Sequence, residues 1–215
     1  MNIFFDLDGT LWDSKHRLYT LFCDITRQKE LSLAEYWELK RAKVSNEQIL
    51  ERLGFSKIQI KYFVEKWMER IEEERYLKLD TLFPFTKNVL QKLHEQGYNI
   101  YYVTLRQSAS KVLEEIKDKG IAEYCLDCLV SEAKTTKEQL VRDAGITLSQ
   151  EDLFVGDTGV DVLTAKVLGI KSVAVLSGFR SKKVLESYVP DRLIDDISQL
   201  DTCITIQKDT SGNLY

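Results

Sequence analysis

The sequence has few of the residues and patterns that mark several common classes of protein. Only two histidines, His16 and His94, occur among 215 residues, which argues against a histidine-rich metal centre and most histidine-based acid–base schemes. No apolar run approaches the ~18 residues that span a bilayer, and the N-terminus lacks a basic and apolar signal pattern. We therefore expect a cytoplasmic protein with no membrane partner.

Cysteine is also scarce, and its spacing does not establish a redox or zinc site. Cys125 and Cys128 form a CxxC pair, but they lie in the apolar segment YCLDCLV without a second Cys/His pair at zinc spacing. Two buried small side chains are the simpler interpretation. A disulfide framework is not expected in a chain of this length and compartment.

The balance of charged and apolar residues excludes two further classes. The net charge of -4 argues against a surface that coats nucleic acid, because such a surface needs many Lys and Arg residues to neutralise phosphates. A hydrophobic content of 44% argues against a mainly disordered chain. At 215 residues, the chain is long for one ordinary domain, so we expect either one large domain or one domain with an addition.

The second half of the chain alternates helix-like and strand-like segments. Helix-like stretches end at glycines 23 to 25 residues apart, namely Gly97, Gly120, Gly145 and Gly169. The apolar runs that follow them are Ile100–Thr104, Cys125–Val130, Leu153–Val155 and Ser172–Leu176. With Ile3–Phe5 as a first strand and Arg192–Ile194 as an edge strand, this pattern predicts an α/β fold. Its core would be a Rossmann-like parallel sheet with helices on both faces.

Residues 14–82 do not follow this alternation. Leu18, Leu21, Phe22 and Ile25 recur at helical spacing, as does a second set from Ile60 to Ile71. We expect three or four amphipathic helices here, forming an inserted all-α domain. The core domain would then comprise residues 1–13 and 83–200, with a C-terminal tail at 201–215.

Polar side chains follow three of the predicted strands. Asp6 and Asp8 follow the first strand, Thr104 ends the second, and Asp157 and Asp161 follow the strand at 153–155. Ligands bind beyond the carboxyl ends of parallel strands, so we expect these side chains to meet at one edge of the sheet. Each also has a purely structural alternative, as a turn residue, a strand end or a helix cap.

Carboxylates without histidine are typical of a hard-cation site. Magnesium takes oxygen ligands and keeps several waters, so Asp6, Asp157 and a backbone carbonyl near Asp8 would suffice. A carboxylate can also act as a nucleophile towards a phosphoryl group, and a neighbouring carboxyl group can act as general acid and base. The sequence therefore favours phosphoryl chemistry with Mg²⁺ as cofactor.

Three segments resemble motifs of the haloacid dehalogenase (HAD) superfamily. FFDLDGTLWDS resembles the first motif, DxDGT after an apolar strand, YYVTLRQS resembles the second, and LFVGDTGVD resembles the fourth, GDxxxD. The resemblance implies that Asp6 is the nucleophile and a magnesium ligand. It implies that Asp8 is the general acid/base and binds magnesium through its backbone carbonyl. Thr104 would bind phosphate, and Asp157 would bind magnesium with Asp161 as its partner.

The third motif of the superfamily, a lysine, has two candidates in this chain. Lys134 and Lys137 both precede the helix that leads to Asp157, and neither is followed by the proline that many members have. Lys137 is favoured, because apolar residues begin three positions later, as in members whose lysine opens the helix. Arg106 and Arg180 also lie on loops near the predicted site, where we expect ordinary surface charge.

The insertion at 14–82 lies where the superfamily has its type-1 cap, which closes over the site and selects the substrate. The resemblance is to phosphoglycolate phosphatases and related enzymes. It implies a magnesium-dependent phosphatase that hydrolyses a small phosphorylated metabolite through an aspartyl-phosphate. A phosphomutase of the β-phosphoglucomutase type is the main alternative. A 2-haloacid dehalogenase lacks the second aspartate and needs no magnesium, so Asp8 and Asp157 count against it. A catalytically silent binding module would be expected to have lost a motif residue.

Overall fold

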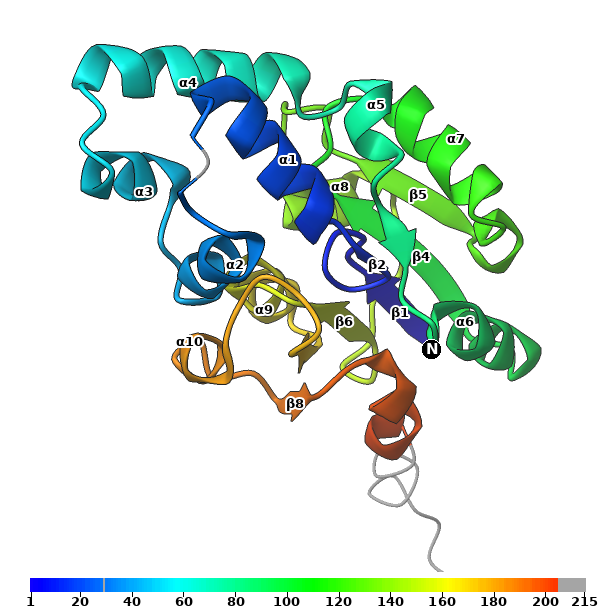
Figure 1. Ribbon diagram of the computed structural model, residues 1–215. Coiled ribbons are helices and arrows are strands. Elements are labelled where there is room, and N and C mark those ends of the chain that lie inside the picture. Colours follow the sequence, from blue (N-terminus) through cyan, green and yellow to red (C-terminus); the bar gives the residue numbers. More distant parts are fainter. Residues whose placement is uncertain (29, 205–215) are drawn as a thin grey trace, which may run out of the picture.

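The computed structural model describes residues 1–28 and 30–204, and its centre is a parallel β-sheet (Figure 1). Six strands lie in the order β5-β4-β1-β6-β7-β8. Their bounds are β1 Asn2–Phe5, β4 Asn99–Thr104, β5 Asp127–Val130, β6 Leu153–Gly156, β7 Lys171–Val175 and β8 Arg192–Ile194. The first strand is therefore central, between β4 and β6, and the expected edge strand at 192–194 lies at the edge.

Helices cover both faces of this sheet, because successive side chains of each buried strand point to opposite sides. On one face, Phe4 and Phe154 pack with Val141 of α8 and Ala165 of α9. The other face contacts α6, α7 and η2 through Ile3, Phe5, Leu90, Val112 and Ile197. The remaining bounds are α6 Thr86–Glu95, α7 Ala109–Asp118, η1 Ala122–Tyr124, α8 Lys137–Asp143, α9 Gly159–Leu168, α10 Lys182–Glu186 and η2 Ile197–Gln199. The predicted Rossmann-like α/β fold is confirmed.

The residues between β1 and α6 are mainly helical and lie beyond the sheet edge at which β1 ends (Figure 1). The helices are α1 Lys15–Thr26, α2 Leu33–Arg41, α3 Asn46–Arg52, α4 Lys57–Arg70 and α5 Glu74–Leu77. Ser32, Ser45 and Ser56 form capping boxes that start α2, α3 and α4. The described residues thus form five helices where three or four were expected. The additional one, α5, is a single turn too short to produce a periodic apolar pattern.

This helical segment has an apolar core of its own. Phe22 of α1 packs against Tyr36 of α2 and Phe63 of α4, with ring centroids 5.0 and 5.6 Å away. The chain enters and leaves the segment through a short antiparallel pair, β2 (Trp12–Asp13) and β3 (Thr81–Leu82). The two ends are therefore held side by side, which suits an insertion into a loop of the sheet domain.

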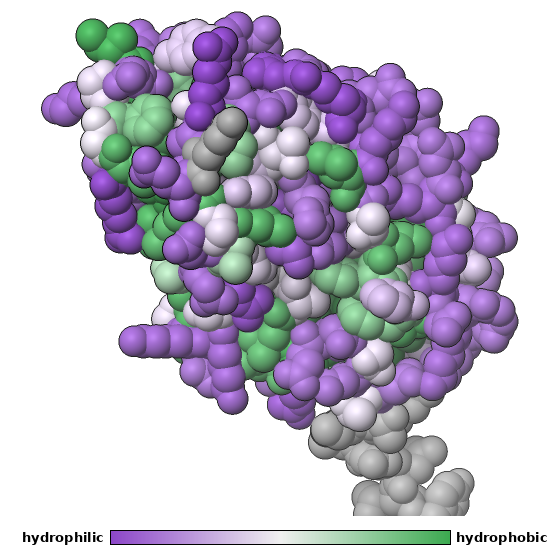
Figure 2. Space-filling model, viewed as in Figure 1, coloured by the Kyte–Doolittle hydropathy of each residue, from purple (hydrophilic) through white to green (hydrophobic). Residues whose placement is uncertain are grey.

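The remaining expectations concern cysteines, membranes and the C-terminus. All four cysteines are free thiols, and burial raises the pKa of Cys125 and of Cys128 to about 12, which disfavours the reactive thiolate. Among the described residues, no helix combines the length and apolar character needed to cross a membrane. Hydrophilic side chains cover most of the face seen in Figure 2. Cys203 and Ile204 are buried against the sheet core, and the rest of the expected tail, 205–215, lies outside the described residues.

Candidate active site

The carboxyl ends of three neighbouring strands place the predicted site residues together. Asp6 directly follows β1, Thr104 is the last residue of β4, and Asp157 directly follows β6. Asp161 lies in the first turn of α9, which begins just beyond β6. All four residues are buried, so this edge of the sheet holds a dense group of polar side chains shielded from solvent.

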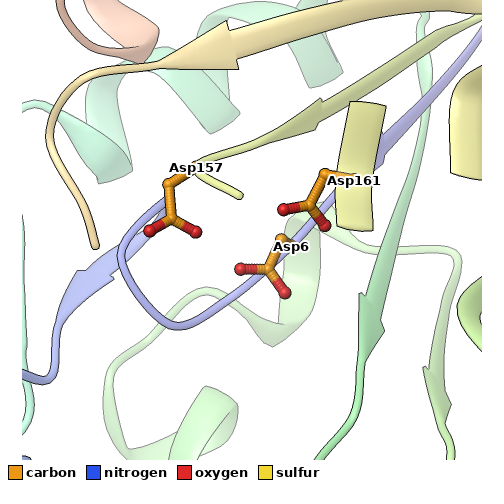
Figure 3. Close-up of side chains that lie close together, drawn as sticks. All are labelled: Asp6, Asp157 and Asp161. Carbon is orange, nitrogen blue, oxygen red and sulfur yellow. The ribbon is translucent and has the colours of Figure 1, made fainter. Parts of the chain in front are cut away.

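Three aspartates form the centre of this group (Figure 3). One carboxylate oxygen from each of Asp6, Asp157 and Asp161 lies within 4.8 Å of the others. Burial, together with the neighbouring carboxylates, raises the pKa of Asp6 to about 7 and that of Asp157 well above its usual range. Three carboxyl groups thus face one lysine, Lys137, and ionising all of them is unfavourable without a further positive charge.

The donor set of this cluster fits a hard divalent cation. Asp157 Oδ2 accepts a hydrogen bond from the backbone N–H of Phe179, whereas Asp157 Oδ1 is buried without a partner among the described residues. Buried carboxylate oxygens are costly when unpaired, and a cation bound by oxygen would satisfy them. Asp6 and Asp157 can both offer side-chain oxygens, while the oxygens of Asp161 are engaged by protein donors.

The Asp157 carboxylate fits in its place because two neighbouring residues are glycines without a Cβ atom. A Cβ on Gly178 would lie 2.0 Å from Asp157 Oδ2, and a Cβ on Gly9 would lie 2.4 Å from the same atom. Gly9 also has a positive φ of 89°, a conformation that side chains other than glycine rarely adopt. The DG pair of the first motif thus allows the loop after β1 to approach the carboxylate at the end of β6.

The structure brings Lys137, and not Lys134, to the aspartate cluster. Lys137 is the first residue of α8, and its Nζ donates hydrogen bonds to Asp6 Oδ1 and, at 2.6 Å, to Asp161 Oδ1. Burial disfavours its charge, but Asp161 and Asp6 outweigh that effect and raise the pKa of Lys137. Lys134 has a side chain that is 74% exposed and pairs with Glu132.

Asp161 also holds the loop that carries it. Its Oδ2 accepts hydrogen bonds from the backbone N–H of Thr158 at 2.9 Å and from the Thr158 hydroxyl at 2.6 Å. The helix-cap role weighed as an alternative is therefore real, but it coexists with the contact to Lys137. One carboxylate both starts α9 and orients the lysine that faces Asp6.

The side chain of Asp8 points to a different set of partners. Its Oδ2 accepts a hydrogen bond from Arg106 Nε at 2.6 Å, and its Oδ1 accepts from Arg106 at 2.8 Å, from Arg17 and from the Ser14 hydroxyl. Burial opposes ionisation, but Arg106 and Arg17 outweigh it and hold the pKa of the Asp8 carboxyl well below its usual range. In this arrangement Asp8 is an ionised carboxylate.

The expectation that Arg106 is ordinary surface charge is wrong. Its side chain is only 5% exposed and also pairs with Asp80 at 2.9 Å and with Glu115 at 3.1 Å. Arg17 of α1 completes the group through a 3.0 Å bond to Asp80. We call Asp8, Arg17, Asp80, Arg106 and Glu115 the buried ion cluster, and it joins the helical segment to the sheet domain.

Sequence reasoning missed four members of this cluster, namely Arg17, Asp80, Arg106 and Glu115. Arg17 follows Lys15 and His16 in the first turn of a helix, and Asp80 lies near a turn, so neither has a local pattern that predicts burial. Arg106 did carry a positional signal, since it follows the end of β4 at Thr104 by two residues. A charged residue just beyond the carboxyl end of a central strand deserves consideration as a site residue.

A parallel sheet with aspartates and a buried lysine at its carboxyl edge indicates a Rossmann-like hydrolase whose catalytic groups are carboxylates. The family of this hydrolase follows from comparison with known proteins. The sequence profile described as haloacid dehalogenase-like hydrolase matches residues 3–175, and the chain belongs to this family. The predicted superfamily and the prediction of a hydrolase are thereby confirmed.

Individual relatives agree with this assignment. A phosphoglycolate phosphatase of Vibrio vulnificus is 26% identical over 220 residues, covering 92% of this chain and 93% of its own length. A phosphoglycolate phosphatase of Pseudomonas fluorescens is 26% identical over 218 residues, covering 92% of this chain and 77% of its own. A haloacid dehalogenase-like family hydrolase from Streptococcus pneumoniae shares the fold, with a TM-score of 0.76, 23% identity and coverage of 94% and 97%.

Proposed function

We propose that the chain is a magnesium-dependent phosphatase that hydrolyses a small phosphomonoester through an aspartyl-phosphate formed on Asp6. One observation carries the proposal: Asp6 accepts a hydrogen bond from Lys137 and shares a cluster with Asp157, whose Oδ1 is buried without a partner among the described residues. Asp6 and Lys137 also line a cavity of about 390 Å³ that can admit a substrate. Relatives named phosphoglycolate phosphatases, 26% identical to this chain, support the same chemistry.

Asp6 would attack phosphorus, so its carboxylate must stay oriented and ionised beside an anion. Lys137 orients it through the hydrogen bond to Oδ1 and brings a positive charge to the same place. Thr104 Oγ1 accepts a hydrogen bond from Arg106 N at 3.3 Å, which leaves its hydroxyl hydrogen free for a phosphoryl oxygen. A magnesium ion bound by Asp6, Asp157 and the backbone carbonyl of Asp8 would offset the repulsion between Asp6 and the phosphate.

Asp8 would serve first as the acid that protonates the ester oxygen and then as the base that activates water. The arginines keep it ionised, which is the form that the base step needs. For the acid step, the carboxyl group has to take up a proton and leave Arg106 and Arg17. Substrate binding would therefore have to loosen the buried ion cluster.

Residues 14–82 would act as the cap of this enzyme, with residues 1–13 and 83–200 as its core domain. Leu18, Met68 and Ile71 of the helical segment line the same cavity as Asp6. Side chains of this segment would then contact the leaving group of the substrate and exclude water from the phosphoryl centre.

The proposed function is tested by metal removal. Purified protein should hydrolyse p-nitrophenyl phosphate with Mg²⁺ and lose activity by about 10²-fold in EDTA, since the cation supplies several kcal/mol of charge stabilisation. Added Mg²⁺ should restore the rate of hydrolysis. Asp157→Asn should raise the Mg²⁺ concentration that gives the half-maximal rate. Unchanged hydrolysis in EDTA would refute the magnesium dependence. Release of inorganic phosphate, rather than an isomerised substrate, separates a phosphatase from a phosphomutase.

Two lysine variants test the assignment of the third motif. Lys137→Ala should lower kcat for p-nitrophenyl phosphate by about 10²-fold, because it leaves Asp6 and Asp161 without their buried counter-charge. Lys134→Ala is the matched control and should stay close to wild type, because that side chain is exposed. An unimpaired Lys137→Ala variant would show that this lysine is not the catalytic one.

A further inference from the structure

The cavity that Asp6 lines also contains a carboxylate of which only one oxygen is hydrogen-bonded. Glu72 lies between α4 and α5 and lines the cavity from the side of the helical segment. It is 7% exposed, so water has little access to its carboxylate. Its position opposite the sheet edge suits contact with the part of a substrate that is not transferred.

Protein contacts fix the position of Glu72 but leave one of its oxygens free. Glu72 Oε1 accepts a hydrogen bond from the backbone N–H of Gln107 at 2.6 Å, and Lys111 Nζ donates to the Glu72 backbone carbonyl at 2.6 Å. Glu72 Oε2 is buried without a hydrogen-bond partner among the described residues. Leaving a buried acceptor of this kind unpaired costs about 1–3 kcal/mol, and more for a charged group.

The two buried arginines that line this cavity do not compensate Glu72. Arg17 and Arg106 direct their charge to Asp8 and Asp80. An ionised carboxylate only accepts hydrogen bonds, so the missing partner of Glu72 Oε2 is a donor. Ammonium and hydroxyl groups supply such a donor, whereas a second carboxylate does not.

We infer that Glu72 determines substrate specificity by accepting a hydrogen bond from an amino or hydroxyl group on the leaving group of the phosphomonoester. The inference rests on the proposed phosphatase function and narrows it to amino- or hydroxyl-bearing phosphate esters. It also disfavours phosphoglycolate, whose carboxylate would lie near Glu72 with no proton to donate. The preferred substrate would then differ from that named for the Vibrio and Pseudomonas relatives.

The experiment compares kcat/KM for 2-aminoethyl phosphate, ethyl phosphate and phosphoglycolate in the presence of Mg²⁺. Wild type should prefer 2-aminoethyl phosphate to ethyl phosphate by at least about tenfold, because a site built for a donor rejects an analogue without one. Glu72→Gln keeps an oxygen for Gln107 N and turns an amide N–H₂ into the cavity. It should shift the ratio of 2-aminoethyl phosphate to phosphoglycolate towards phosphoglycolate by at least about tenfold.

Ratios within one variant cancel any general loss of activity, so they report specificity and not stability. Glu73→Gln is the matched control, because it removes the neighbouring charge, whose carboxylate pairs with Arg70 and Arg75. It should leave the ratios unchanged. The inference is overturned if wild type and Glu72→Gln have the same ratio of kcat/KM for 2-aminoethyl phosphate to that for phosphoglycolate. It is also overturned, without any variant, if wild type prefers phosphoglycolate. Failure to hydrolyse any phosphomonoester, p-nitrophenyl phosphate included, overturns the proposed function itself.

Discussion

Replacing Asp6 by Asn should lower phosphatase activity by about 10⁴-fold or more while the protein stays folded. The amide has nearly the same shape as the carboxylate and still offers an oxygen to Lys137 Nζ, but it does not attack phosphorus. The expected result is loss of p-nitrophenyl phosphate hydrolysis at saturating Mg²⁺, with an unchanged far-UV circular dichroism spectrum. Persistent turnover by Asp6→Asn would exclude an aspartyl-phosphate on this residue.

The same variant should be more stable than wild type when no divalent ion is present. Burial raises the pKa of Asp6 from 3.8 to about 7, so the folded protein binds this proton more tightly than the unfolded chain does. The wild-type protein therefore loses stability as pH rises from about 4 through about 7, because the buried Asp6 carboxyl group ionises. Asp6→Asn avoids this loss, because the amide does not ionise. In EDTA at pH 8, the Tm of Asp6→Asn should exceed that of wild type. Asp118→Asn, which changes an exposed aspartate, should alter neither Tm nor activity.

Much of the sheet could be predicted because its signals are local. A continuous apolar run such as 153–155 reads as a strand buried on both faces, and a glycine such as Gly169, with φ of 70°, ends the preceding helix. The strand expected at 125–130 shows the limit of such signals. It begins only at Asp127, because residues 122–124 form a 3₁₀ turn that the apolar composition does not reveal.

The residues of the site likewise fall into those that could be predicted from local sequence signals and those that could not. Asp6, Thr104 and Asp157 could be placed from sequence, because each follows or ends a strand and strand ends converge in a parallel sheet. The residues that join Asp8 in the buried ion cluster could not, since they include residues as distant in sequence as Arg17 and Glu115. Its members satisfy one another across the junction of helical segment and sheet domain, and only the folded chain shows which charges meet there.

The second large effect that we expect is a loss of stability when an arginine of the buried ion cluster is replaced. The cluster contains three carboxylates but only two guanidinium groups. Burial raises the pKa of Asp80 to about 7 and also raises that of Glu115, although both contact Arg106. With Asp8 held ionised, three carboxylates share Arg17 and Arg106, and Lys119 adds only a longer contact of 3.9 Å to Glu115. Removing an arginine should therefore harm the fold more than neutralising Asp80.

Arg106→Leu should lower the free energy of unfolding by about 3–5 kcal/mol, the usual cost of stranding a buried charge. Leucine also removes the guanidinium that lies 5.7 Å from the centre of the Trp12 ring. Asp80→Asn is the matched comparison and should cost less, about 1–3 kcal/mol, because the amide keeps one acceptor oxygen while its N–H₂ group faces one of the two arginines that Asp80 contacts. Urea denaturation of the three proteins in EDTA measures both differences.

The pH dependence of the Arg106→Leu defect separates lost charge from lost packing. Without Arg106, the pKa values of Asp80 and Glu115 rise further above those of the unfolded chain, and the pKa of Asp8 is held down less strongly. Both changes remove stability as pH rises. The loss relative to wild type should accordingly be larger at pH 8 than at pH 5, where the stranded carboxyl groups can take up protons. A defect of equal size at both pH values would mean that Arg106 stabilises the junction by packing alone, and that the carboxylates around it do not depend on its charge.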